Sequence, residues 1–136
     1  MADEWVLVDR LEDPIDYVVA DATGIEKGAL LKLTDSGTAI LATAAGDMVA
    51  GVASSEKIAN DGRTQLGVYK RGRFRAVASG AVTVGEPIAV AAGATNRFAG
   101  VQGQSGAAVI GTAEYTAAVD EAGQVFLNVG VGINPN

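Results

Sequence analysis

One sequence pattern occurs twice in this chain and limits what the chain can fold into. Residues 28–33 form a glycine turn and a short apolar run, and residues 47–53 then form a second run that ends in Gly-Val-Ala. The same order returns at residues 85–90 and 107–113, where the second run ends in Gly-Thr-Ala. The copies begin 57 residues apart. Neither copy holds a side chain suited to catalysis, so the repeat predicts a scaffold whose product is shape and contact.

Short apolar runs between glycine and aspartate turns predict an all-β fold with at most one short helix. Residues 35–37 (Asp-Ser-Gly) and 61–62 (Asp-Gly) are turn signals, because glycine tolerates positive φ and aspartate can bond its own backbone. Helix signals are confined to one possible turn at residues 54–59 and to the alanine-rich residues 89–94. Two copies are too few for a solenoid. We therefore expect a compact β-barrel or sandwich built from two similar lobes.

The chain is one domain by length, with 136 residues. The acidic residues 1–14 are predicted to form an extended N-terminal arm. Residues 15–136 are predicted to form a single β-rich domain, with pseudo-repeated segments at about 24–56 and 81–116. Because glycine and alanine are abundant and aromatic residues are few, the core should be only marginally stable without a partner.

Several functions are disfavoured by residues that the sequence lacks. It has no Cys and no His, which removes thiolate metal sites, the commonest zinc ligand and the commonest general base. The net charge of −6 argues against a nucleic-acid partner. No apolar stretch approaches a membrane span, and the acidic N-terminus is unlike a signal peptide. We expect soluble intracellular synthesis, no cofactor, no metal, and no nucleic-acid or membrane partner.

A basic cluster at residues 70–75 holds four of the ten basic side chains. One interpretation is a contact patch for an acidic surface, for example the acidic arm of a neighbouring copy. The other is a solvated strand face that protects a sheet edge from aggregation. The candidate contact residues are Lys70, Arg71, Arg73, Phe74 and Arg75.

The only tryptophan lies in the acidic N-terminal segment. Chain termini fray unless they are tied down. The segment could therefore be an arm that docks on a partner by apolar anchors or by adding a strand. Alternatively, it packs back on its own core. The candidate anchors are Trp5, Val6, Leu7 and Val8.

Three further motifs are weak. The carboxylates of Glu12, Asp13 and Asp16 could suggest calcium, but Pro14 interrupts the run and solvated charge is the better interpretation. Residues 100–106 resemble a phosphate loop without its Gly-Lys-Ser/Thr ending, so we expect a flexible hairpin loop. A Ser-Lys pair such as Ser55 with Lys57 is conceivable, but nothing supplies a pocket or an oxyanion hole. We therefore predict that the chain is not an enzyme.

The order of strand and glycine phrases along the chain resembles a known family, the capsid cement or head decoration proteins of tailed bacteriophages. The resemblance extends over nearly the whole chain from about residue 15, and no single motif in it is specific. The matching phrases are at residues 18–25, 27–33, 45–53, 69–74, 81–88, 109–113 and 125–129.

The resemblance implies a β-rich fold, β-tulip-like in many relatives, and commonly a homotrimer. Such trimers are made in the host cytoplasm, bind the outer surface of the expanded head, and clamp neighbouring copies of the major capsid protein. Residues 1–13 match in position the segment that often orders on the capsid in related proteins. Three other classes stay open: a tail, fibre or cell-surface adhesion module, a small-ligand barrel, and a hydrolase using Ser and Lys.

Overall fold

The computed structural model describes residues 3–44, 46–91, 96–101 and 107–133. These residues contain no helix, and so none that is long and apolar enough to cross a membrane. The prediction of an all-β fold with a closed barrel is therefore confirmed. The turn at residues 54–59 is a bend and a bridge instead of a helix. Residues 92–94 of the alanine-rich stretch and 102–106 of the glycine-rich loop lie outside the described part.

The strands are β1 (Val6–Arg10), β2 (Ile15–Val18), β3 (Leu30–Asp35), β4 (Thr38–Leu41), β5 (Val49–Ala53), β6 (Gln65–Tyr69), β7 (Arg71–Val77), β8 (Pro87–Val90), β9 (Phe98–Gly100), β10 (Ala108–Ala113) and β11 (Ala122–Ile133).

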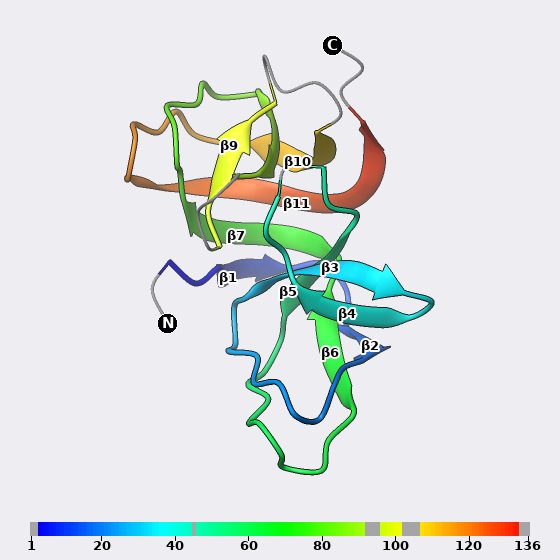
Figure 1. Cartoon of the computed structure of the whole chain (residues 1–136). Helices are drawn as coiled ribbons and strands as arrows, with labels where there is room; N and C mark the ends of the chain where they lie inside the picture. Colours follow the sequence, from blue (N-terminus) through cyan, green and yellow to red (C-terminus); the bar gives the residue numbers. More distant parts are fainter. Residues whose placement is uncertain (1–2, 45, 92–95, 102–106, 134–136) are drawn as a thin grey trace.

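These strands form two halves with the same internal order (Figure 1). Strands β2 to β6 make a closed barrel, in which β6 pairs with both β2 and β5, and β3 pairs with both β5 and β4. Strands β7 to β11 pair in the corresponding order, β7-β11-β10-β8-β9. Val18 meets Thr38 in a parallel pairing that closes the barrel, and Ala78 meets Phe98 in a parallel bridge at the matching place of the second half. The sequence repeat is thus a repeat of topology.

A matching glycine begins the repeated unit in each half. Gly28 and Gly85 both have φ of +87°, a conformation that favours glycine. The Gly28 N–H donates to the Ala53 carbonyl at 3.0 Å, and the Gly85 N–H donates to the Ala113 carbonyl at 2.7 Å. Each turn therefore holds the start of one strand against the end of another.

The core has two parts. One cluster fills the barrel and includes Leu31, Leu66 and Val68. The larger cluster lies between the barrel and the six-stranded sheet, where Leu30 of β3 meets side chains of the second half such as Phe74. The two halves therefore share a core.

The sheet of the second half gains one extra strand from the N-terminus. Strand β1 pairs antiparallel with β7, with Val6 opposite Arg75 and Arg10 opposite Gly72. Figure 1 shows β1 lying along β7, where the two halves meet. The predicted extended arm at residues 1–14 needs correction, because residues 6–10 are a paired edge strand of the domain.

Candidate interaction surfaces

Trp5 is a core residue and not a free anchor. Its side chain is 3% exposed, and its ring lies edge-on to Phe74 and Phe98, with centroids 5.9 and 6.2 Å away. Its indole N–H donates to the Asn96 carbonyl at 2.7 Å, and its backbone N–H donates to the Gly28 carbonyl at 2.9 Å. The docking-anchor hypothesis is wrong for Trp5, because these contacts use both its apolar ring and its polar atom within the same chain.

The other three predicted anchors differ in exposure, because successive side chains of a strand point to opposite faces. Leu7 is half-buried and packs against the larger core cluster. Val6 and Val8 are 52% and 44% exposed. The register of β1 shifts between Leu7 and Asp9, which marks a bulge at this edge of the sheet. Val6 and Val8 are thus the two predicted anchors that face solvent.

Strand β7 presents its arginines to one side and its apolar residues to the other. Arg71, Arg73 and Arg75 are exposed, whereas Gly72 and Phe74 between them are buried. This is the period-two alternation of a strand with one face on the core. Phe74 is 1% exposed, so its prediction as a contact residue is corrected: it lies in the core.

Lys70 joins the two halves at the point where the chain passes from β6 to β7. Its Nζ donates to the Tyr17 hydroxyl at 2.7 Å and lies 5.4 Å from the centre of the Tyr17 ring. The side chain is half-buried. Lys70 is therefore held against β2 and is less available to a partner than the arginines.

The central arginine of β7 is neutralised within the chain. Arg73 Nη1 lies 3.1 Å from Asp9 Oδ2 on β1, and its Nε lies 2.7 Å from Glu114 Oε1 just after β10. Among the described residues, Arg71 and Arg75 form no ion pair. Two exposed guanidinium groups therefore remain available for contact on this side of the sheet.

We call the solvent side of β1, β7 and β11 the outer sheet face. Two shallow hollows open on it. One, of about 310 Å³, is lined by Asp9, Arg10, Leu11, Arg73 and Phe126. The other, of about 210 Å³, is lined by Arg75, Tyr115, Thr116, Ala122, Gly123 and Gln124. A larger groove of about 430 Å³ lies beside the outer sheet face, between β1 and the barrel, and is lined by Glu4, Trp5, Val6, Leu7, Lys27, Ser54 and Tyr69.

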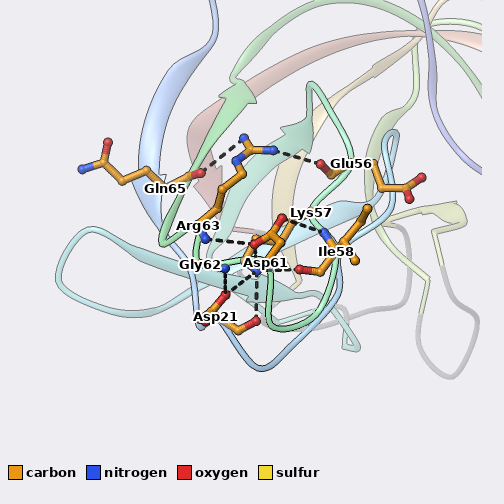
Figure 2. A network of polar contacts seen from close by, with 8 residues as sticks. All are labelled: Asp21, Glu56, Lys57, Ile58, Asp61, Gly62, Arg63 and Gln65. Atoms are coloured by element: carbon orange, nitrogen blue, oxygen red, sulfur yellow. Dashed lines mark hydrogen bonds and ion pairs between the residues drawn. The ribbon is translucent and has the colours of Figure 1, made fainter.

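A buried ammonium group lies between the segments that follow β2 and β5 (Figure 2). The Lys57 side chain is fully buried, and its Nζ donates to Asp61 Oδ1 at 2.7 Å and Asp21 Oδ1 at 3.1 Å. It also donates to the backbone carbonyls of Asp21 and Ile58, at 2.9 and 2.8 Å. Asp21 in turn accepts the Gly62 N–H at 2.8 Å. Lys57 therefore ties together two loops that are distant in sequence.

The charges in this cluster stabilise one another. The hydrogen bond from Lys57 and the N–H of Arg63 hold the pKa of Asp61 at about 2, below its ordinary value of 3.8. Burial alone would lower the pKa of Lys57, but its hydrogen bonds to Asp61 and Asp21 outweigh burial and raise it. The raised pKa favours the protonated form of Lys57. Sequence reasoning missed this role, although the aspartates near Lys57 were visible.

The described residues contain no group of three or more Asp or Glu side chains that could hold a metal ion. At the acidic turn that follows β1, Asp13 pairs with Arg10, and Asp16 is exposed on β2. Glu12, the third carboxylate of this group, is half-buried.

Comparison with known proteins adds one finding about the fold. No protein-family model matches the chain, and no curated protein matches its sequence. A solved structure does match: the N base of the head fiber gp8.5 of bacteriophage phi29, with a TM-score of 0.53 and 16% sequence identity. The match covers 83% of this chain and 91% of the phage chain. The two chains share a fold.

The site that remains for contact is the outer sheet face with its exposed edge. Of the predicted contact residues, those that reach solvent there are Val6, Val8, Arg71, Arg73 and Arg75. Sequence reasoning missed Phe126, which is half-buried beside Arg73 and has no charged neighbour in sequence to mark it.

Proposed function

We propose that this chain is a structural protein of a phage virion that decorates the outer surface of the head. In this proposal a homotrimer binds the expanded shell and clamps neighbouring major capsid proteins. The observation that carries the proposal is the shared fold with a phage head fiber base over most of both chains. The order of strand phrases along the sequence, which resembles head decoration proteins, supports the same assignment independently.

The surface of the protein supports a role in contact. The outer sheet face combines exposed valines of β1 with the arginines of β7, and both are set on paired strands. A rigid sheet face loses little conformational entropy on binding. Many weak contacts of this kind, repeated over a multimer, add to a strong attachment. Clamping a shell requires such contacts and no catalytic group.

Head binding tests the proposal directly. Purified chain is mixed with expanded heads that lack decoration and, as a control, with unexpanded heads of the same phage, and each mixture is sedimented. We expect saturable co-sedimentation with expanded heads and little with unexpanded heads. Absence of binding to expanded heads by a folded chain would overturn the assignment.

A second candidate function is the base of a head or tail appendage, or another adhesion module. It is favoured by the nature of the structural neighbour, which is the N base of a head fiber. A chain of this kind would bind glycans or host cells, or would hold a further fibre chain. Binding in a glycan or host-cell assay together with no affinity for expanded heads would favour this function over decoration.

A further inference from the structure

One end of the outer sheet face carries a positive charge that the chain does not neutralise. Arg75 of β7 is exposed and lines the 210 Å³ hollow, and no described acidic side chain forms an ion pair with it. Two glutamates are adjacent in sequence to the lining of this hollow. Glu114 is paired with Arg73, and the Glu121 carboxylate accepts the N–H of Ala118 at 3.1 Å. The guanidinium of Arg75 is therefore available to an anion from outside the chain.

The side chains next to Arg75 in the hollow can form hydrogen bonds. Gln124 of β11 is directly opposite Arg75, and opposite residues of antiparallel strands have Cβ atoms on one face about 4.5–5.5 Å apart. Thr116 Oγ1 accepts the Val84 N–H at 3.1 Å, which leaves its own O–H free to donate to a ligand. A guanidinium, an amide and a hydroxyl group thus line one small space. This set suits a ligand that is rich in oxygen atoms.

An exposed aromatic ring completes the lining of the hollow. Tyr115, just after β10, is 59% exposed. The face of an aromatic ring carries partial negative charge, so the weakly positive C–H groups of a saturated ring pack well on it. The remaining lining residues, Ala122 and Gly123, are small and leave space above the sheet. The hollow therefore offers a platform for a ring beside groups that can bind the oxygen atoms of that ring.

The sheet topology and the size of the hollow favour a sugar over a peptide. Strand β7 lies between β1 and β11, and β11 lies between β7 and β10, so neither is an edge strand that captures an extended peptide. The volume of 210 Å³ is below the range of about 300–1,000 Å³ for pockets that hold drug-sized ligands. Recognition here must use side chains over an area close to that of a single ring.

We propose that this hollow binds a hexuronic acid, which is a sugar ring that carries a carboxylate. The carboxylate pairs with the Arg75 guanidinium, whose parallel N–H groups match its two oxygens. The sugar ring lies on Tyr115, and Gln124 and Thr116 form hydrogen bonds to its hydroxyl groups. The site goes beyond the proposed function and does not depend on it. On a head-decorating protein it would hold the particle on an acidic polysaccharide.

An NMR titration tests the site in the free chain. Nitrogen-15-labelled chain is titrated with glucuronate, galacturonate and mannuronate, with glucose, galactose and mannose as neutral counterparts, and with acetate as a carboxylate without a ring. The amide signals of Gly123 and Gln124 report binding at the hollow. We expect saturable shifts with at least one hexuronate. The dissociation constant of its neutral counterpart should be at least about tenfold higher, because hydrogen bonds between ionised groups are strong.

Variants locate the binding. Arg75→Gln should raise the dissociation constant for the hexuronate at least about tenfold, and Tyr115→Ala about threefold or more. Arg71→Gln removes an exposed arginine of the same strand that does not line the hollow, so it is the matched control and should bind as wild type does. Circular dichroism checks that the variants fold. Tyr115 lies outside β7, so Tyr115→Ala keeps the site testable if Arg75→Gln does not fold.

Absence of shifts at the hollow with all three hexuronates would overturn the site. Equal binding of a neutral sugar or of acetate would do the same, and so would unchanged binding by Arg75→Gln. Tighter binding of N-acetylglutamate amide than of any hexuronate would assign the hollow to an acidic peptide instead. Head binding is measured separately. Hexuronate binding without head binding removes the proposed function and keeps this site, whereas head binding without hexuronate binding does the reverse.

Discussion

Lys57 and Ala117 occupy the same place in the two halves of this protein, 60 residues apart. Lys57 exchanges two backbone hydrogen bonds with Ile25, at 2.7 and 2.9 Å, and Ala117 exchanges two with Val82, at 2.9 and 3.0 Å. The backbone is repeated, but the side chains differ: one is a buried ammonium among carboxylates and the other is a methyl group in the shared core. Matching backbone positions therefore hold a polar tie in one half and apolar packing in the other.

Removing the ammonium group should destabilise the barrel. Lys57→Ala leaves the carboxylates of Asp21 and Asp61 without their partner, and breaking a buried pair from one side is costly. We expect the Tm to fall by roughly 5–10 °C. Lys27→Ala removes an exposed lysine and should change the Tm by less than about 2 °C. Thermal unfolding followed by circular dichroism measures both; equal shifts would contradict a structural role for Lys57.

Acid should weaken the same tie. The pKa of Asp61 is about 2 in the folded protein, below its ordinary value of 3.8, so the folded state prefers the ionised carboxylate. This contribution to the free energy of unfolding is complete above about pH 5 and is lost as the pH falls through 3.8 toward 2. We expect the stability gap between wild type and Asp61→Asn to narrow over that range. Urea unfolding at several pH values measures it, and a constant gap would argue against the assigned pKa.

Two glycines that match across the repeat should tolerate no side chain. A Cβ on Gly51 would overlap the Tyr69 carbonyl oxygen, and one on Gly111 would overlap the Phe126 carbonyl oxygen. Each neighbour is backbone of the next strand and cannot rotate away. We expect Gly51→Ala and Gly111→Ala to cost about 2 kcal/mol or more each, in the range of overpacked cores. Gly80→Ala, with open space around its Cβ, is the control and should be nearly neutral.

Trp5 should matter to folding more than to partner binding. Trp5→Ala removes a buried indole that contacts Phe74 and Phe98, and such truncations cost about 3–5 kcal/mol. Val6→Ala, on the exposed side of β1, should cost less than about 0.5 kcal/mol. Chemical denaturation distinguishes them. A stable Trp5→Ala chain that has lost only head binding would restore the docking-arm hypothesis. By the same reasoning, deleting residues 1–13 should damage the fold itself.

The repeat and its turns could be predicted from sequence because they depend on local backbone needs. Gly28 and Gly85 mark φ values that other residues rarely adopt, and the Asp35-Ser36-Gly37 signal lies at the β3–β4 hairpin. The all-β class followed from these phrases. The matching isolated bridges of the two halves, Ile25–Lys57 and Val82–Ala117, join residues that are distant in sequence, so they could be recognised only in the tertiary structure.

The contact residues were harder to predict because burial depends on distant neighbours. Trp5 lies among charges in sequence, yet its polar partner is Asn96 and its ring partners come from β7 and β9. Residues 5–8 are a continuous apolar run, so no alternation of apolar and polar residues in the sequence indicates which side chains face the core. Phe74 likewise lies between arginines that face the other way.

The most direct test of the proposed head-surface role is a cryo-EM map of the phage particle that is proposed to carry this chain. We expect density for the two-lobed β fold on the outside of the expanded head, in contact with the major capsid protein. Density for this chain inside the shell, at the tail alone, or nowhere on the particle would contradict the proposed function.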